Sequence, residues 1–286
     1  MTGATGRVGR ELVHELLASG LPVRALTRRP ASSLADLPAG VEVVTGDLTV
    51  PESLDASLQG VTAVFLVWTA PPETVPAVVA RLAEHARRVV LLSSPHQTPH
   101  PFFQQPNRMA AFHAELERLI AETRLEATIL RPGMFASNAR LWWAPQIQRG
   151  DVVRWPYGSV ETAPVDERDI AAVAARALTE DRHIGGDYVL TGPHAISQAG
   201  QVEAIGVALG RRLQFVELSP DDFRREMADR APAPAINMLL NAWQAASGYP
   251  AFLTSTVADI LGRPARTFQQ WAVEHAEDFR APTADG

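Results

Sequence analysis

The sequence predicts an α/β fold with a doubly wound parallel sheet, and three observations lead to this class. Strand-like apolar runs alternate with helical patterns over the first 190 residues. Two of these runs, VTAVFLVW at 61–68 and RVVLLSS at 88–94, are almost entirely apolar, which is typical of strands buried on both faces. A glycine-rich turn, TGATGRVG, leads into an amphipathic helix at the start of the chain. Alternation of this kind places helices on both faces of a parallel sheet.

The elements of the sheet domain follow in order along the chain. Residues 7–19 form a predicted helix because Leu12 and Leu16 recur on one apolar face. Pro51 begins a short helix that ends before Gly60. Further strands are predicted at 22–27, 41–44, 61–68, 88–94 and 126–131, and further helices at 73–87 and 107–123.

After Pro132 the pattern loosens. The predicted elements there are a helix near 137–149, strands near 151–155 and 160–163, a helix from Asp166 to about Thr179, and a last strand of the main sheet at 187–191. From residue 197 the chain is mainly helical, with helices predicted at 197–208, 220–230, 233–247, 256–261 and 267–279. We expect a sheet domain over 1–155, to which 160–191 returns, and a smaller, mostly helical substrate region made of 192–286 and 134–160.

The composition excludes several classes of function. The chain has no cysteine, which rules out disulfides, thiolate metal sites and cysteine nucleophiles, and its histidines lack companion carboxylates at metal-ligand spacing. All 26 basic residues are arginine, so no catalytic step uses a lysine. The net charge of −6 disfavours a nucleic-acid partner. Without a signal peptide or an apolar run of about 18 residues, we expect a cytoplasmic protein with no membrane partner.

The glycine-rich turn is a candidate phosphate site. Gly3, Gly6 and Gly9 let backbone N–H groups approach a pyrophosphate at the start of a helix. The second predicted strand then ends in LTRRP, which places Arg28 at its tip. An acidic residue at such a tip selects NAD, whereas an arginine suits the 2′-phosphate of NADP. The sequence therefore predicts NADP(H) in preference to NAD(H), while a merely solvated role for Arg28 remains open, more so for Arg29.

Several motifs together resemble one family. TGATGRVG, LTRRP, GDL at 46–48, ILRPGMF at 129–135 and the ending RPARTFQQWAVEH are similar to the NmrA-like branch of the atypical short-chain dehydrogenase/reductase family. The resemblance implies a Rossmann-type NAD(P)H-binding domain, and members include reductases of quinones and dyes as well as redox sensors that bind regulatory proteins. The cofactor-binding residues expected from the turn, the strand tip and the resemblance are Gly3, Thr5, Gly6, Arg7, Val8, Gly9, Arg28, Asp47, Leu48, Trp68, Thr69, Pro132 and Gly133.

One element of the family pattern is missing before the turn. Members carry a short apolar strand there, whereas only Met1 and Thr2 precede Gly3. Without that strand, backbone groups of its neighbours would be unpaired. We expect that Met1 stands where the last valine of the strand would be and that the native start lies a few codons upstream, since GTG encodes valine and also serves as a start codon.

The catalytic pair departs from the family pattern. Typical short-chain reductases use Tyr-x-x-x-Lys, and counting back from Glu117 places Met109 and His113 at those two positions. Two routes remain open. Hydride transfer to a conjugated or cationic acceptor needs little acid from the protein, or His113 supplies the proton, since its ordinary pKa of about 6.5 suits transfer near neutrality.

The remaining candidates surround the expected active site. Ser94 closes a strand and is a candidate catalytic hydrogen-bond donor, although strands also end in serine for structural reasons. His96 and His100 lie in the loop after it, either facing substrate or solvated. Substrate contacts are also expected from Met109, Met134, Asn138 and Trp142, with Asn138 alternatively capping a helix. Phe102, Phe103, Trp142 and Trp143 are candidates for an aromatic substrate wall, with one of the two tryptophans expected in the core.

We therefore predict an NADPH-dependent reductase of a small conjugated or aromatic acceptor. Two alternatives remain: a non-catalytic NADP(H) sensor that binds a protein partner, and a non-redox enzyme on the same fold. The expected partner is a small-molecule substrate, and a homodimer is compatible with the sequence.

Overall fold

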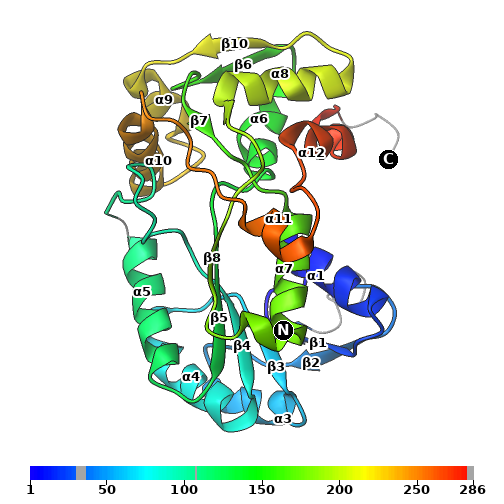
Figure 1. Ribbon diagram of the computed structural model, residues 1–286. Helices are drawn as coiled ribbons and strands as arrows, with labels where there is room; N and C mark the ends of the chain where they lie inside the picture. The colour runs from blue at the N-terminus through cyan, green and yellow to red at the C-terminus, as the bar shows by residue number, and fades with distance from the viewer. Residues whose placement is uncertain (30–36, 107, 282–286) are drawn as a thin grey trace.

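The computed structural model describes residues 1–29, 37–106 and 108–281, and it contains the predicted parallel sheet (Figure 1). One part is a parallel pair of strands, β1 (Val23–Thr27) and β2 (Val41–Thr45). The other part has four parallel strands in the order β3 (Ala63–Leu66), β4 (Arg88–Leu92), β5 (Glu126–Pro132) and β8 (Asp187–Leu190). The strand order steps outward in both directions from the start of the chain, as a doubly wound fold requires.

Helices cover both faces of the sheet. On one face lie α1 (Arg7–Ala18), α7 (Glu167–Thr179) and α11 (Thr256–Leu261), whose buried side chains form one apolar cluster with β1. The other face carries α3 (Asp55–Leu58), α4 (Val75–His85), α5 (Arg108–Ala121) and the 3-10 helix at Pro51–Leu54. The α/β fold class predicted from the sequence is thereby confirmed.

Local sequence explains the contact between α1 and α7. Leu12 and Val13 of α1 are fully buried, and α7 meets them with Ala171 and Ala174, whose small side chains allow close approach. Asp166 precedes α7, and its carboxylate accepts a hydrogen bond from the Arg168 N–H at 2.9 Å, which satisfies a free donor of the first turn. Because α1 follows the glycine turn directly, this packing holds the turn in place.

Met1 and Thr2 join the two parts of the sheet. The Met1 ammonium donates to the Arg24 carbonyl oxygen at 2.6 Å, and the Leu26 N–H donates to the Met1 carbonyl oxygen at 2.9 Å. On the other side, the Thr2 N–H donates to the Phe65 carbonyl oxygen at 3.0 Å. Two residues thus pair with β1 and β3 where a full strand would lie, and the rest of that strand position is a cavity.

A second group of elements lies beyond the carboxyl ends of the strands (Figure 1). We call it the cap, and it contains α6 (Asn138–Ile147), β6 (Val152–Trp155), β7 (Glu161–Thr162), β9 (Ile196–Ser197), α8 (Gln198–Leu209), β10 (Gln214–Glu217), α9 (Pro220–Met227), α10 (Ala233–Ala246) and α12 (Phe268–Glu274). Three short 3-10 helices complete the chain, at Pro72–Thr74, Asp181–His183 and Ala276–Phe279.

The cap differs from the sequence prediction in four places. The short strand β10 pairs in parallel with β6, and β9 pairs antiparallel with β7, in regions expected to be helical or irregular. Both strands are too short to show a periodic pattern. The predicted single helix at 267–279 is divided into α12 and a 3-10 turn, and the predicted helix at 220–230 ends at Met227.

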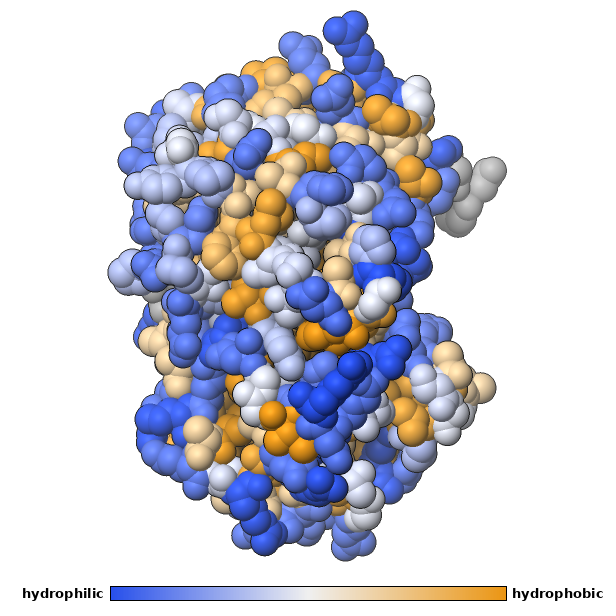
Figure 2. All heavy atoms as spheres, in the orientation of Figure 1, coloured by the Kyte–Doolittle hydropathy of each residue, from blue (hydrophilic) through white to orange (hydrophobic). Residues whose placement is uncertain are grey.

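The hydropathy of the surface does not distinguish the sheet domain from the cap (Figure 2). Apolar side chains form separate patches over the face in Figure 2, from the cap to the sheet domain, among mostly polar neighbours. Among the residues that the structure describes, no helix is long and apolar enough to cross a membrane.

Candidate active site

The glycine turn is shaped by close backbone contacts. Gly3 has a φ of +64°, which favours glycine, and the Gly6 N–H donates to the Gly3 carbonyl oxygen at 2.9 Å. A Cβ atom at Gly9 would lie only 2.0 Å from that carbonyl oxygen, so no side chain fits there. The first turn of α1 has no side-chain cap at Gly6. Its N–H groups are therefore available for an anion, as a phosphate cradle requires.

A cavity of about 310 Å³ opens beside this turn. It brings together seven of the predicted cofactor residues, Gly3, Thr5, Gly6, Arg28, Asp47, Leu48 and Thr69. The pKa of the Asp47 carboxyl is lowered, first by the hydrogen bond from the Thr49 N–H at 2.8 Å and also by the charge of Arg28. The cavity therefore presents an arginine and an ionised carboxylate at the tips of β1 and β2, where a dinucleotide places its adenosine half.

Arg7 connects the turn to the cap. Its guanidinium donates to Ser137 Oγ at 2.9 Å and to Asn138 Oδ1 at 3.1 Å. Ser137 in turn donates to the buried carboxylate of Glu167, whose pKa is raised by burial. Asn138 is the first residue of α6 and does not cap it, so the capping alternative is wrong. Its side-chain amide oxygen instead accepts the hydrogen bond from Arg7.

Ser94 and His113 meet at the carboxyl end of β4. His113 Nδ1 lies 2.8 Å from Ser94 Oγ, although 19 residues separate the two in the sequence. Burial lowers the pKa of His113 to about 4, against a smaller opposing effect of Glu117. The imidazole is therefore neutral near pH 7, where it hydrogen-bonds with Ser94 but holds no extra proton to give away.

Arg131 stabilises the backbone at Ser94 through a buried network of hydrogen bonds. Its guanidinium is almost fully buried and donates to both oxygens of Glu117, at 2.8 and 2.7 Å, and to both oxygens of Asp187, at 2.6 and 3.0 Å. It also donates to the Ser94 carbonyl oxygen at 3.1 Å. His96 lies against the same group, with Nδ1 3.1 Å from the Ser94 carbonyl oxygen. This buried network fixes the backbone that carries Ser94, and sequence reasoning missed it.

Pro132, Gly133 and Met134 lie at the carboxyl end of β5. Pro132 is buried, whereas Gly133 and Met134 line a small aromatic pocket together with Phe102 and Phe103. The structure therefore brings the two phenylalanines of the predicted wall to the place where the resemblance puts the nicotinamide.

Other predicted residues lie elsewhere. Trp142 and Trp143 both pack in the core of the cap, where Trp142 stacks on Trp155 with ring centroids 5.8 Å apart. The expectation that one of the two tryptophans lies in the core is confirmed, because Trp143 is fully buried whereas Trp142 is only partly buried at the edge of the same cluster. Met109 is 57% exposed on α5 and lines none of the cavities described here.

Val8 and Trp68, two of the predicted cofactor residues, have side chains that are engaged in other contacts. Val8 is buried in the core, so its backbone alone faces the turn. Trp68 donates its indole N–H to the Ala70 carbonyl oxygen at 2.6 Å and packs against Phe112. Among the described residues, no group of three His, Asp or Glu side chains is placed to hold a metal ion.

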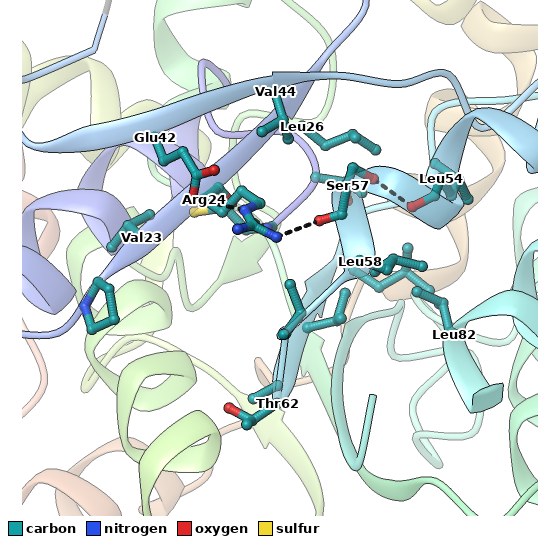
Figure 3. Close-up of a pocket in the computed structure, with 18 of the residues that line it drawn as sticks. Val23, Arg24, Leu26, Glu42, Val44, Leu54, Ser57, Leu58, Thr62 and Leu82 are labelled. Atoms are coloured by element: carbon teal, nitrogen blue, oxygen red, sulfur yellow. Dashed lines mark hydrogen bonds and ion pairs between the residues drawn. The ribbon is translucent and has the colours of Figure 1, made fainter. Parts of the chain in front are cut away.

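A further cavity of about 340 Å³ lies inside the sheet and is distinct from the cofactor cavity (Figure 3). It occupies the gap between β1 and β3 behind Met1, and its walls combine polar groups with apolar side chains, among them Leu58 and Leu82 on the helix side. Arg24 reaches across it and donates to the Ser57 carbonyl oxygen at 2.9 Å. Burial, and then the charge of Arg24, lower the pKa of the Met1 amine to about 5.

Comparison with known proteins agrees with this geometry. A model of an NAD(P)H-binding family matches residues 3–181. The chain is 38% identical to (4-alkanoyl-5-oxo-2,5-dihydrofuran-3-yl)methyl phosphate reductase of Streptomyces griseus subsp. griseus, over 98% of both chains. It is 31% identical to an NAD(P)H azoreductase of Xenophilus azovorans, over 98% of this chain and 99% of the relative.

A solved structure is also similar. The NADPH complex of an NADPH-dependent quinone oxidoreductase from Escherichia coli superposes with a TM-score of 0.80 and 25% identity, covering 96% of this chain and 98% of that one. The match extends over the sheet domain and the cap alike.

Proposed function

The chain belongs to the NAD(P)H-binding, NmrA-like family of Rossmann-type oxidoreductases, and on that premise we propose that it is an NADPH-dependent reductase of a small conjugated or aromatic acceptor. The observation that supports the proposal is the Ser94–His113 pair, which lies at the carboxyl edge of the sheet in a chain that has no lysine for a Tyr-Lys pair. The Ser94–His113 pair offers hydrogen bonds but no strong acid.

The preference for NADPH rests on Arg28. This exposed arginine stands at the tip of β1, beside the cofactor cavity, and no acidic residue occupies the tip. A guanidinium pairs with a phosphate group through charged hydrogen bonds. A ribose diol instead donates hydrogen bonds to a carboxylate. Gly3, Gly6 and Gly9 would hold the pyrophosphate against the start of α1.

The chemistry fits an acceptor that is already electron-poor. Bound NADPH supplies a hydride to one end of a conjugated system, and the electron pair moves to an oxygen or nitrogen at the other end. Ser94 Oγ is placed to donate a hydrogen bond to that atom, with His113 orienting the hydroxyl. A proton from water completes the product. Because the pKa of His113 is lowered to about 4, the route that needs little acid is favoured over proton donation by His113.

The names of the relatives support this acceptor class. The Streptomyces griseus relative acts on an alkanoyl-oxo-dihydrofuranyl compound, in which carbonyl groups adjoin an unsaturated ring, and the Xenophilus azovorans relative acts on azo compounds. Both kinds of acceptor take up a hydride at a conjugated system. We propose the same class for this chain.

The test is consumption of NADPH with a panel of quinones, azo dyes and unsaturated lactones. We expect turnover with at least one class, and a loss of about 10-fold in kcat for Ser94→Ala, equivalent to one hydrogen bond of about 1.4 kcal/mol. Ser247→Ala, at an exposed position after α10, is the matched control. Tight NADPH binding without turnover of any acceptor would instead favour the redox-sensor alternative.

A further inference from the structure

We propose that Phe103 and Phe252, joined through His100, form the wall that selects flat conjugated acceptors. The inference rests on the proposed reductase function and assigns its acceptor specificity to two segments that are distant in the sequence. One is the loop after β4, which contains residues 95–106. The other is the segment between α10 and α11, at 247–255.

His100 ties the two segments together. Its Nδ1 accepts a hydrogen bond from the Phe102 N–H at 3.2 Å, so the ring proton lies on Nε2. Nε2 then donates to the Pro250 carbonyl oxygen, 3.0 Å away and 150 residues along the chain. The side chain is 9% exposed, and both ring nitrogens have partners. The His100 ring, with both nitrogens hydrogen-bonded, thus holds the two segments side by side.

The second segment is also fixed to the sheet. The Thr254 N–H donates to Thr191 Oγ1 at 3.0 Å, and Thr254 Oγ1 donates to the Val189 carbonyl oxygen at 2.9 Å. These bonds attach the segment to the end of β8, beside the end of β5. Phe252 is therefore carried on a segment anchored at both Pro250 and Thr254.

The rings converge on the expected nicotinamide position. Phe103 and Phe252 meet edge to face, with centroids 6.5 Å apart and planes at 89°. Both line the same pocket as Gly133 and Met134, and a Cβ at Gly133 would lie 3.6 Å from the ring edge of Phe103. An acceptor bound over the nicotinamide would therefore have a phenylalanine ring on its other side.

Phe103 and Phe252 are more exposed than the phenylalanine rings in the two cores. Phe65 and Phe223 in the two cores are 1% exposed, whereas Phe103 and Phe252 are only half-buried. The pocket between them has a volume of about 10 Å³, which is smaller than one aromatic ring. An acceptor over the nicotinamide must therefore displace the two rings and replace part of their mutual contact with packing against its own far face. A flat conjugated ring restores that contact, and a compact aliphatic acceptor does not.

The test compares acceptors of different flat area. The wild-type protein, Phe103→Leu and Phe252→Leu are assayed with NADPH and either 2-methyl-1,4-naphthoquinone or a small unsaturated lactone. We expect KM for the naphthoquinone to rise about 3- to 10-fold in each variant, with kcat, the lactone KM and the NADPH Kd little changed. Phe103→Tyr keeps the ring and should retain the wild-type KM. Phe215→Leu, in the cap on β10, is the matched control.

His100 acts by positioning the two segments. Two variants test whether its hydrogen bond to Pro250 does this. His100→Leu removes the bond to Pro250 and should raise the naphthoquinone KM without changing kcat, whereas His100→Gln keeps a donor and should restore it. If the wild type reduces the naphthoquinone and the Phe103 and Phe252 variants match Phe215→Leu, the wall is wrong and the reductase function stands. If the wild type binds no NADPH, the proposed function and this inference both fail.

Discussion

Ser94 and His113 were each predicted from local patterns, one as a strand end and the other by counting along a helix. Their 2.8 Å contact follows from the packing of α5 against β5, the strand next to β4, which the sequence does not reveal. Arg131 shows the same limit. A charged residue inside an apolar strand is a visible signal, but its partners Glu117 and Asp187 lie 14 and 56 residues away and are fixed only by the fold.

His113 should be neutral near pH 7. Burial lowers its folded pKa to about 4, below the ordinary value of 6.5, so the unfolded chain binds more protons between these two values. This histidine should therefore reduce stability as the pH falls from about 6.5 towards 4, and His113→Asn should be less sensitive to acid over that interval. Nuclear magnetic resonance titration of the His113 ring measures the pKa directly. A midpoint near 6.5 would contradict this account.

Removing Arg131 should destabilise the protein strongly. Arg131→Met leaves the carboxylate of Glu117, which is 11% exposed, without its charged partner, at an expected cost of about 3–5 kcal/mol. Arg131→Lys should not restore stability, because one ammonium cannot reproduce the two-pronged contact with each carboxylate. Arg87→Met, which breaks an exposed pair with Glu126, is the control and should change little. Urea unfolding measures all three, and equal losses for Arg131 and Arg87 variants would refute the account.

Among the elements, long periodic segments were predicted well and short ones were not. The helices α1 and α7 and the buried strands lie close to their predicted positions, because each has a clear apolar pattern. The strands β9 and β10 were missed, since two to four residues show no period and their pairing partners lie far along the chain. The division of the last helix at His275 likewise depends on packing within the cap.

The gap between β1 and β3 should accept an added strand. A version of the chain lengthened before Met1 by about five apolar, β-branched residues should gain thermal stability, because the stretch would fill the cavity and pair with both neighbours. A Gly-Ser stretch of equal length is the control, and differential scanning calorimetry is the measurement. Equal melting temperatures for the two versions would show that the gap does not bind a strand.

The same gap predicts a pH dependence for the chain that begins at Met1. Its amine has a folded pKa of about 5 against an ordinary value of 8.0, so the unfolded state binds more protons between pH 5 and 8. The contribution of this group to stability should therefore rise with pH across that window. Lengthening the chain converts the amine to an amide and should remove this part of the pH dependence. An unchanged dependence would mean that the amine is not buried as described.

At the scale of the whole molecule, we propose that the sheet domain holds the cofactor and that the cap closes the acceptor side. The sequence predicted this division because the glycine turn, the strand tip and the loop after β4 all lie at the carboxyl edge of a parallel sheet. It could not predict that the segment before α11 reaches the same edge. That contact joins Pro250 to His100 across 150 residues, and it arises from the route of the chain through the cap.

The measurement that tests the central claim most directly is a fluorescence titration of the purified protein with NADPH and with NADH. We predict that NADPH binds more tightly than NADH, and that Arg28→Ala weakens NADPH binding by about 10- to 100-fold, the value of a charged hydrogen bond, with little effect on NADH. Arg29→Ala is the control and should have a smaller effect. Equal affinity for the two cofactors, unchanged by Arg28→Ala, would contradict the predicted preference, and binding of neither would contradict the reductase itself.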